Sequence, residues 1–215
     1  MSNTSHSGFH STAVAAVNEA LVTLGQDVIL TELSTASSVV QSRKAAFQYE
    51  SSRLRVLRDH NWNFAKREEL ATAYPVGVTG PFRFAVQVPA QCVRVLACVD
   101  LAGRKCQWRM IGTSEIRLDR PCFKIEYIED VKNLDRWSSD AYRCLVLRLA
   151  ADLAKPITGR ISERQIQEEA YKDQLENAKL TDAKENNTPD EAWGDNYYAQ
   201  AMRGNSFRAR PPFIR

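Results

Sequence analysis

Long apolar runs, paired cysteines and a strong net charge are all missing from this sequence of 215 residues. No stretch approaches the roughly 18 apolar residues that a membrane span needs, so we expect a protein with no membrane partner. Residues 1–11 are rich in serine and lack the basic start and apolar centre of a signal peptide. The net charge of +3 is too small to indicate nucleic-acid binding by itself.

The cysteines and histidines do not form a recognisable motif. The five cysteines are odd in number and include no C-x-x-C pair, which favours free thiols in a reducing cytosol over a disulfide framework. Three scattered histidines are too few for a zinc site, so we expect no metal and no cofactor. A catalytic Cys–His pair would need His60, but burial as small apolar residues is the favoured interpretation of the thiols. The cysteines considered for such a pair are Cys92, Cys106 and Cys122.

A hydrolase is the weakest of the functions considered. Glu126, Glu129 and Asp130 cluster near the end of a predicted strand. A glycosidase pair needs a cleft and one carboxyl group of raised pKa, and neither is visible in the sequence. A solvated turn is the simpler interpretation, and we predict that the protein is not an enzyme.

Apolar residues at spacings of three and four predict four helices. The first three span about residues 12–24, 36–59 and 139–155, and the fourth begins near Ser162 and fades by residue 186. The third is the most apolar, so we expect it to be the central helix and to end at Pro156. Ser162 and Gln165 match a capping box at the start of the fourth.

The second predicted helix has two contrasting faces. Its apolar face consists of Ala36, Val40, Phe47, Leu54 and Leu57. Its basic face, which we assign to the lumen of a ring or to contact between subunits, consists of Arg43, Lys44, Arg53, Arg55 and Arg58. An ordinary solvated face explains this pattern equally well in isolation. Trp62 and Phe64, which follow the helix, are expected to be core aromatics at the junction with the sheet.

The middle of the chain changes to a period of two. Alternating residues predict five short strands between about residues 82 and 127, separated by glycine and proline. The predicted fold is mainly α: a bundle of about four helices with a small inserted antiparallel β subdomain and an extended C-terminal tail. The expected divisions are a flexible arm at 1–11, the helical bundle at 12–73 and 135–185, the β subdomain at 74–134 and the tail at 186–215.

The predicted tail is rich in aromatic residues and, from Gln200 onward, in arginine without any acid. Disordered tails are usually poor in aromatics, whereas interfaces use aromatic and arginine anchors. We therefore favour binding to another protein over docking on the same subunit. The proposed anchors are Trp193, Tyr197, Tyr198, Arg203, Phe207, Arg208, Arg210 and Phe213.

Four motifs occur in order along residues 13–185. They lie at residues 16–25, at 53–65 with the run from His60 to Ala65, at 84–96, and at 145–158. In their order and spacing these motifs resemble the tail tubular protein A family, the head-to-tail adaptors (head completion proteins) of short-tailed bacteriophages. This chain has Gln91 where family members commonly carry an acid.

The resemblance implies a structural virion protein at the head–tail interface, assembled in the host cytoplasm. It implies a homo-oligomeric ring, commonly of twelve copies, that binds the portal protein on one rim and a tail nozzle or tail tubular protein B-like protein on the other. The C-terminal tail would dock on the portal, and DNA in the lumen would make weak contacts that are indifferent to sequence. The alternative is a DNA-binding accessory protein that uses the basic helix and basic C-terminus. The lack of a helix-turn-helix, zinc or RNP motif argues against it.

Overall fold

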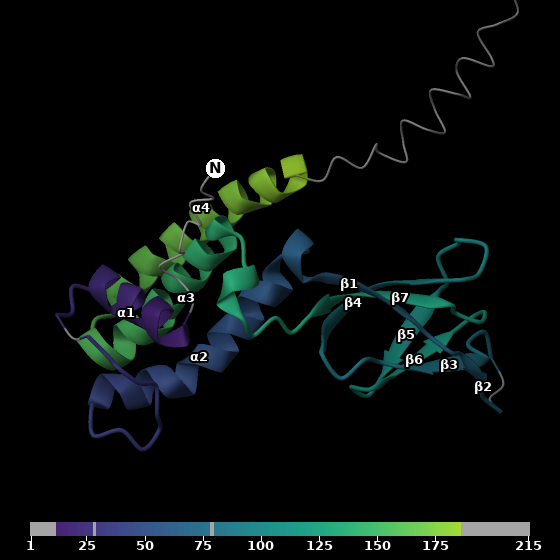
Figure 1. Cartoon of the computed structure of the whole chain (residues 1–215), viewed down its shortest axis with the longest axis horizontal. Coiled ribbons are helices and arrows are strands. Elements are labelled where there is room, and N and C mark those ends of the chain that lie inside the picture. The colour runs from purple at the N-terminus through teal and green to yellow at the C-terminus, as the bar shows by residue number, and fades with distance from the viewer. Residues whose placement is uncertain (1–11, 28, 78–79, 186–215) are drawn as a thin grey trace, which may run out of the picture. The chain divides into compact units, whose positions relative to one another are not determined.

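Helices and strands occur in separate blocks of the chain (Figure 1). The computed structural model describes residues 12–27, 29–77 and 80–185, and within them it contains four α-helices and seven strands. The predicted arm at 1–11 and the predicted docking tail at 186–215, with all its anchors, lie outside these residues. The unit described below ends at Asp182.

The helices share one core. They are α1 (Ala13–Thr23), α2 (Val40–Asp59), α3 (Ser139–Thr158) and α4 (Ile161–Glu185). α3 packs against both α1 and α2, and 12 of its 20 residues are buried, so the prediction of a central third helix is confirmed. α4 adds Tyr171, Leu175 and Ala178 to the same core.

The strands form two antiparallel sheets. One sheet has the order β1 (Lys66–Leu70), β7 (Lys124–Glu129), β4 (Cys92–Val99). The other has the order β2 (Tyr74–Pro75), β3 (Phe84–Gln87), β6 (Glu115–Leu118), β5 (Trp108–Ile111). Residues from both sheets make a second apolar core, which includes Val86, Cys98, Ile116 and Ile125. The five predicted strands are present, and their pairing is antiparallel as expected.

The prediction of a mainly α fold was wrong. Helices make up 48% and strands 20% of the described residues, which is a mixed α/β composition. β1 and β2 were not predicted from the sequence. β1 carries four charged residues and is exposed on both faces, so it shows no alternation of apolar and polar residues. It lies inside the segment 12–73 that was assigned to the helical bundle, yet it pairs with β7.

Several helix boundaries and faces also differ from expectation. α2 begins at Val40, and its predicted apolar face is largely exposed, with Phe47 at 70%. α3 continues through Pro156 to Thr158 and is capped by Gly159, whose φ is 71°. α4 begins at Ile161, so Ser162 lies inside the helix instead of capping it.

Candidate functional site: the junction between helices and sheets

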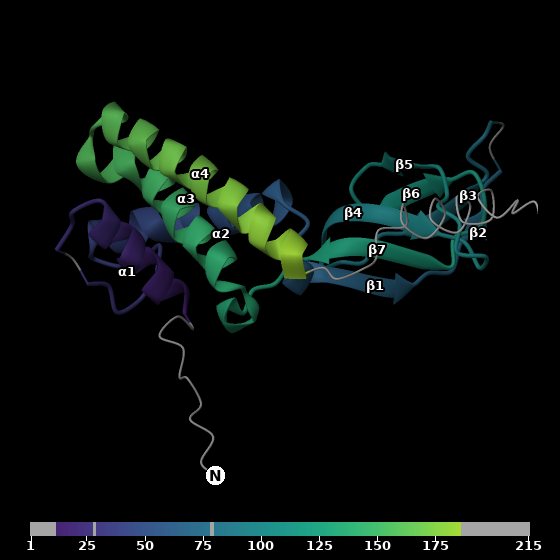
Figure 2. The same ribbon diagram turned by 90° about the horizontal axis from the view of Figure 1, so that it is seen from above.

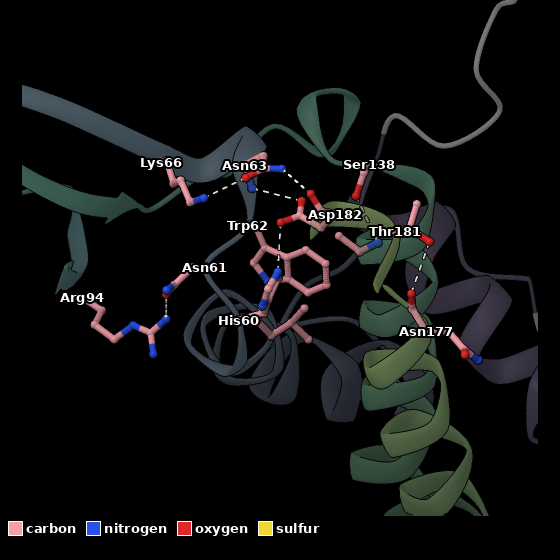
Figure 3. Close-up of polar contacts among 12 residues, drawn as sticks. His60, Asn61, Trp62, Asn63, Lys66, Arg94, Ser138, Asn177, Thr181 and Asp182 are labelled. Carbon is pink, nitrogen blue, oxygen red and sulfur yellow. Dashed lines mark hydrogen bonds and ion pairs between the residues drawn. The ribbon is translucent and has the colours of Figure 1, made fainter. Parts of the chain in front are cut away.

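The segment His60–Asn63 connects α2 to a short 3-10 turn (Asn63–Ala65) that leads directly into β1. All four of its side chains are hydrogen-bonded: His60 and Asn63 to Asp182 of α4, Trp62 to α2 and Asn61 to β4 (Figure 3). We call this segment, together with Asp182 of α4 and Arg94 of β4, the junction. The segment His60–Asn63 lies near the end of the motif at residues 53–65, on which the family resemblance partly depends.

Trp62 is the apolar centre of the junction. Its side chain is fully buried, and its indole N–H donates to the Val56 carbonyl at 2.8 Å. The His60 ring meets it edge-on, with 4.8 Å between centroids, and Phe64 lies between Trp62 and Trp137. The prediction of a core aromatic is confirmed for Trp62, whereas Phe64 is half-buried and packs against the same core.

Asp182 fixes the end of α4 to the junction. Its carboxylate lies 2.9 Å from Nε2 of His60 and accepts the backbone N–H of Asn63 at 3.2 Å. The Asn63 side-chain amide donates to the Asp182 carbonyl at 2.7 Å. Asp182 is only 7% exposed, and a buried carboxylate requires partners of this kind. These contacts hold the last turns of α4 against the start of β1.

Two further contacts tie the junction to the sheet. The Arg94 guanidinium of β4 donates to the side-chain oxygen of Asn61. Lys66, the first residue of β1, donates to the Asn63 side-chain oxygen at 2.8 Å. Because Asn61 and Arg94 belong to two different motifs of the family resemblance, the fold brings these motifs into direct contact.

A groove of about 590 Å³ lies beside the junction, between α2 and the turn that leads into β4. Its lining combines apolar and charged side chains, eight of them from the same two motifs and the other two being Ser51 and Asp130. The lining residues are Ser51, Leu54, Arg55, Arg58, Asp59, Ala90, Gln91, Cys92, Val93 and Asp130. Gln91, where the family commonly has an acid, therefore lies in this groove.

Arg53 is buried, which corrects its assignment to the exposed basic face. Its side chain is 1% exposed and donates to Asp130 at 2.5 Å, to the Val131 carbonyl at 3.1 Å and to Glu50 at 2.7 Å. Burial by itself would lower the pKa of Arg53, but the bonds to Asp130 and Glu50 outweigh it and raise the pKa. The guanidinium therefore joins α2 to the segment that follows β7.

The other four predicted cations do not share one environment. Arg43 donates to the Ser37 carbonyl at 3.0 Å, and Lys44 donates to the Pro156 carbonyl. Arg55 is 57% exposed, with Asp59 at 4.0 Å, and Arg58 is exposed at the groove. Only Arg55 and Arg58 of the five thus present an exposed charge at the groove.

The thiols are placed as structural residues. All five cysteines are free thiols, and Cys98, Cys106, Cys122 and Cys144 are buried. Burial was predicted for Cys106, Cys122 and Cys92, but Cys92 is only half-buried. Burial raises the pKa of Cys144 to about 12 and that of Cys92 to about 11, which disfavours the thiolate. Within the described residues, no group of three or more His, Cys, Asp or Glu side chains is placed to hold a metal ion.

The carboxylates at the end of β7 are engaged in ion pairs. Glu129 accepts from Arg67 at 2.7 Å and from Arg136 at 3.0 Å. Burial alone would raise the pKa of Glu129, but these two arginines hold it below its usual value. Asp130 is bound by Arg53 and Glu126 by Lys124. A general acid needs a raised pKa, so Glu129 is unsuited to that role.

Comparison with protein-family models and with curated protein sequences finds no match for this chain. Among the described helices, none is long and apolar enough to cross a membrane.

Proposed function

We propose that this chain is a structural virion protein, a head-to-tail adaptor that assembles as a ring below the portal of a short-tailed bacteriophage. The ring extends the DNA channel and presents a platform for the tail nozzle. One observation carries the proposal. Two separate segments that resemble the tail tubular protein A family, 53–65 and 84–96, meet at the Asn61–Arg94 bond and line one groove together.

The fixed end of α4 supports this role. Asp182 is held by His60 and Asn63 only four residues before the predicted docking tail begins at 186. The junction joins this end of α4 to the start of β1 through hydrogen bonds and to the core through the buried Trp62.

The environments of the reactive side chains favour a structural role over catalysis. A nucleophilic cysteine works as the thiolate, and burial disfavours this form for Cys92, Cys106 and Cys144. His60, the histidine of the proposed Cys–His alternative, contacts Asp182 and the Trp62 ring.

The alternative of a DNA-binding accessory protein has less support. A phosphate-binding surface needs several exposed cations on one face. Burial of Arg53 and the contacts of Arg43 and Lys44 within their own chain leave Arg55 and Arg58 at the groove, beside Asp59 and Asp130.

Deletion of residues 187–215 tests the docking role of the tail. We expect the truncated protein to remain folded, by circular dichroism, and to lose binding to isolated portal rings. A second, full-length variant, in which Trp193, Tyr197 and Tyr198 are replaced by serine, distinguishes the loss of the aromatic anchors from the shortening of the chain. It should also bind poorly. Normal portal binding by both variants would contradict the docking role.

A further inference from the structure

Two strands in the described part of the chain leave one side of their sheet open. β1 is an outer strand of the three-stranded sheet and β5 an outer strand of the four-stranded sheet (Figure 2). Every residue of both strands is exposed. The other two outer strands offer less. β2 has only two residues and includes Pro75, and the C-terminal end of β4 is covered where the Cys106 N–H donates to the Cys98 carbonyl at 2.8 Å. An open edge is a template for another strand.

The hydrogen-bond pattern shows which residues of each edge face outward. Ala71 donates to the Phe123 carbonyl at 2.8 Å, and bonded pairs alternate along an antiparallel ladder. Glu68 and Leu70 therefore turn their backbone N–H and C=O groups away from β7. In the same way, the bond from Asp119 to the Gln107 carbonyl, at 3.1 Å, leaves those groups of Trp108 and Met110 pointing away from β6.

We propose that β1 of one copy of this chain pairs antiparallel with β5 of the next copy. This inference rests on the proposed ring and deepens it by naming the contact between subunits. One register uses all four outward residues: Glu68 pairs with Met110, and Leu70 with Trp108. It places Glu69 of one copy opposite Arg109 of the other, an attractive cross-strand pair.

The exposed side chains suit this register. Leu70 is 71% exposed and Trp108 is 36% exposed, so their contact removes apolar surface from water on both copies. The contacts that Glu69 and Arg109 already make leave both accessible. Glu69 accepts from the Tyr127 hydroxyl at 3.0 Å, and Arg109 lies over the Phe82 ring at 5.7 Å.

Pairing of either edge with itself is disfavoured by charge. β5 against β5, with both outward residues bonded, sets Arg109 opposite Arg109. β1 against β1, likewise with both outward residues bonded, sets Glu69 opposite Glu69, and like charges directly opposite each other are destabilising. A contact between two different edges is heterologous, and heterologous contacts build rings or filaments instead of closed dimers.

Disulfide trapping tests the pairing. The full-length variant Glu69→Cys with Arg109→Cys places two thiols directly opposite each other across the proposed interface. On oxidation we expect a ladder of covalent oligomers on a non-reducing gel. The matched control, Glu68→Cys with Arg109→Cys, puts the thiols on opposite faces of the paired strands and should give no ladder above the wild-type background.

Each single-cysteine variant serves as a further control. A dimer from Glu69→Cys alone or from Arg109→Cys alone would show self-pairing of that edge and overturn the proposal. Charge reversal gives an independent readout: Glu69→Arg or Arg109→Glu alone should weaken self-association by about twofold to fivefold, and the double reversal should restore it. Failure of the double reversal to restore association would overturn the Glu69–Arg109 register.

Trapping is carried out on the protein alone and again with portal rings, which separates this inference from the proposed function. Portal binding in a fixed ratio, without trapping above the control in either setting, leaves the adaptor role standing and overturns the edge pairing. A ladder in the protein alone, with no portal binding, supports the pairing and contradicts the adaptor role.

Discussion

Arg53 is a cation held inside the fold by oxygen atoms from α2 and from the segment after β7. Removing one member of a buried ion pair is costly because its partner loses its compensating charge. Asp130 and Glu50 are 24% and 60% exposed, so water offsets part of that loss. We expect Arg53→Met to lower the free energy of unfolding by about 2 to 4 kcal/mol, measured by urea denaturation.

Arg55→Met is the matched control, on the same helix but 57% exposed. It should change the free energy of unfolding by no more than about 0.5 kcal/mol. Equal effects of the two substitutions would contradict the assignment of Arg53 to the interior and of Arg55 to the surface.

The ion pairs of Glu129 with Arg67 and Arg136 make the folding stability depend on pH in the acid range. Its pKa in the folded protein lies below the ordinary value of 4.5, so its contribution is complete above pH 4.5 and is lost as the pH falls through the folded value. Glu129→Gln should therefore lower stability at neutral pH and make the loss of stability below pH 4.5 less steep. Unfolding free energies measured across this range test the prediction, and Glu176→Gln, at a 71% exposed position, should keep the wild-type slope.

At the scale of the elements, alternation located β3 to β7 well because one face of most of them packs into the second core. The face of α2 was predicted poorly because polar residues occupy its buried side. Ser42 donates to the Glu32 carbonyl at 2.8 Å, and Ser52 donates to Asp152 at 2.7 Å. These partners are supplied by the tertiary fold, so hydrophobic periodicity could not reveal them.

The end of α3 depends on Gly159 and not on Pro156. Gly159 has a φ of 71° and donates to the Lys155 carbonyl at 3.0 Å. A Cβ there would meet no atom within 4 Å, so the cost of a substitution is conformational. Gly159→Ala should lower stability by about 1 to 2 kcal/mol, whereas Gly159→Asn should cost less because asparagine tolerates this conformation. Equal thermal stabilities of the Gly159→Ala variant and the wild-type protein would contradict this explanation.

The end of α4 depends on Asp182. In Asp182→Ala, the Asn63 N–H loses its acceptor and His60 loses its partner. We expect a loss of about 1 to 3 kcal/mol in unfolding free energy and faster hydrogen exchange in the last turns of α4. Asp173→Ala, at an exposed position on the same helix, is the control. Unchanged exchange in Asp182→Ala would show that the junction does not hold this end.

At the scale of the molecule, a short segment at residues 60–65 connects the helical core to the core between the sheets, and it is recognisable in the sequence by its aromatic residues. The role of Trp62 was predictable because an aromatic residue that follows a long helix usually packs inward. The roles of Asp182 and Arg94 were not, because their partners lie 119 to 122 and 33 residues away in the chain. The basic face was misjudged at Arg53 because a charge pattern alone does not show which cations the fold buries.

The most direct test of the adaptor role is the mass of the purified protein alone and after mixing with portal rings, by native mass spectrometry. The account predicts that the portal takes up this chain in a fixed multiple, commonly twelve for the family that it resembles. A mass unchanged by the portal and by every other virion protein would contradict it.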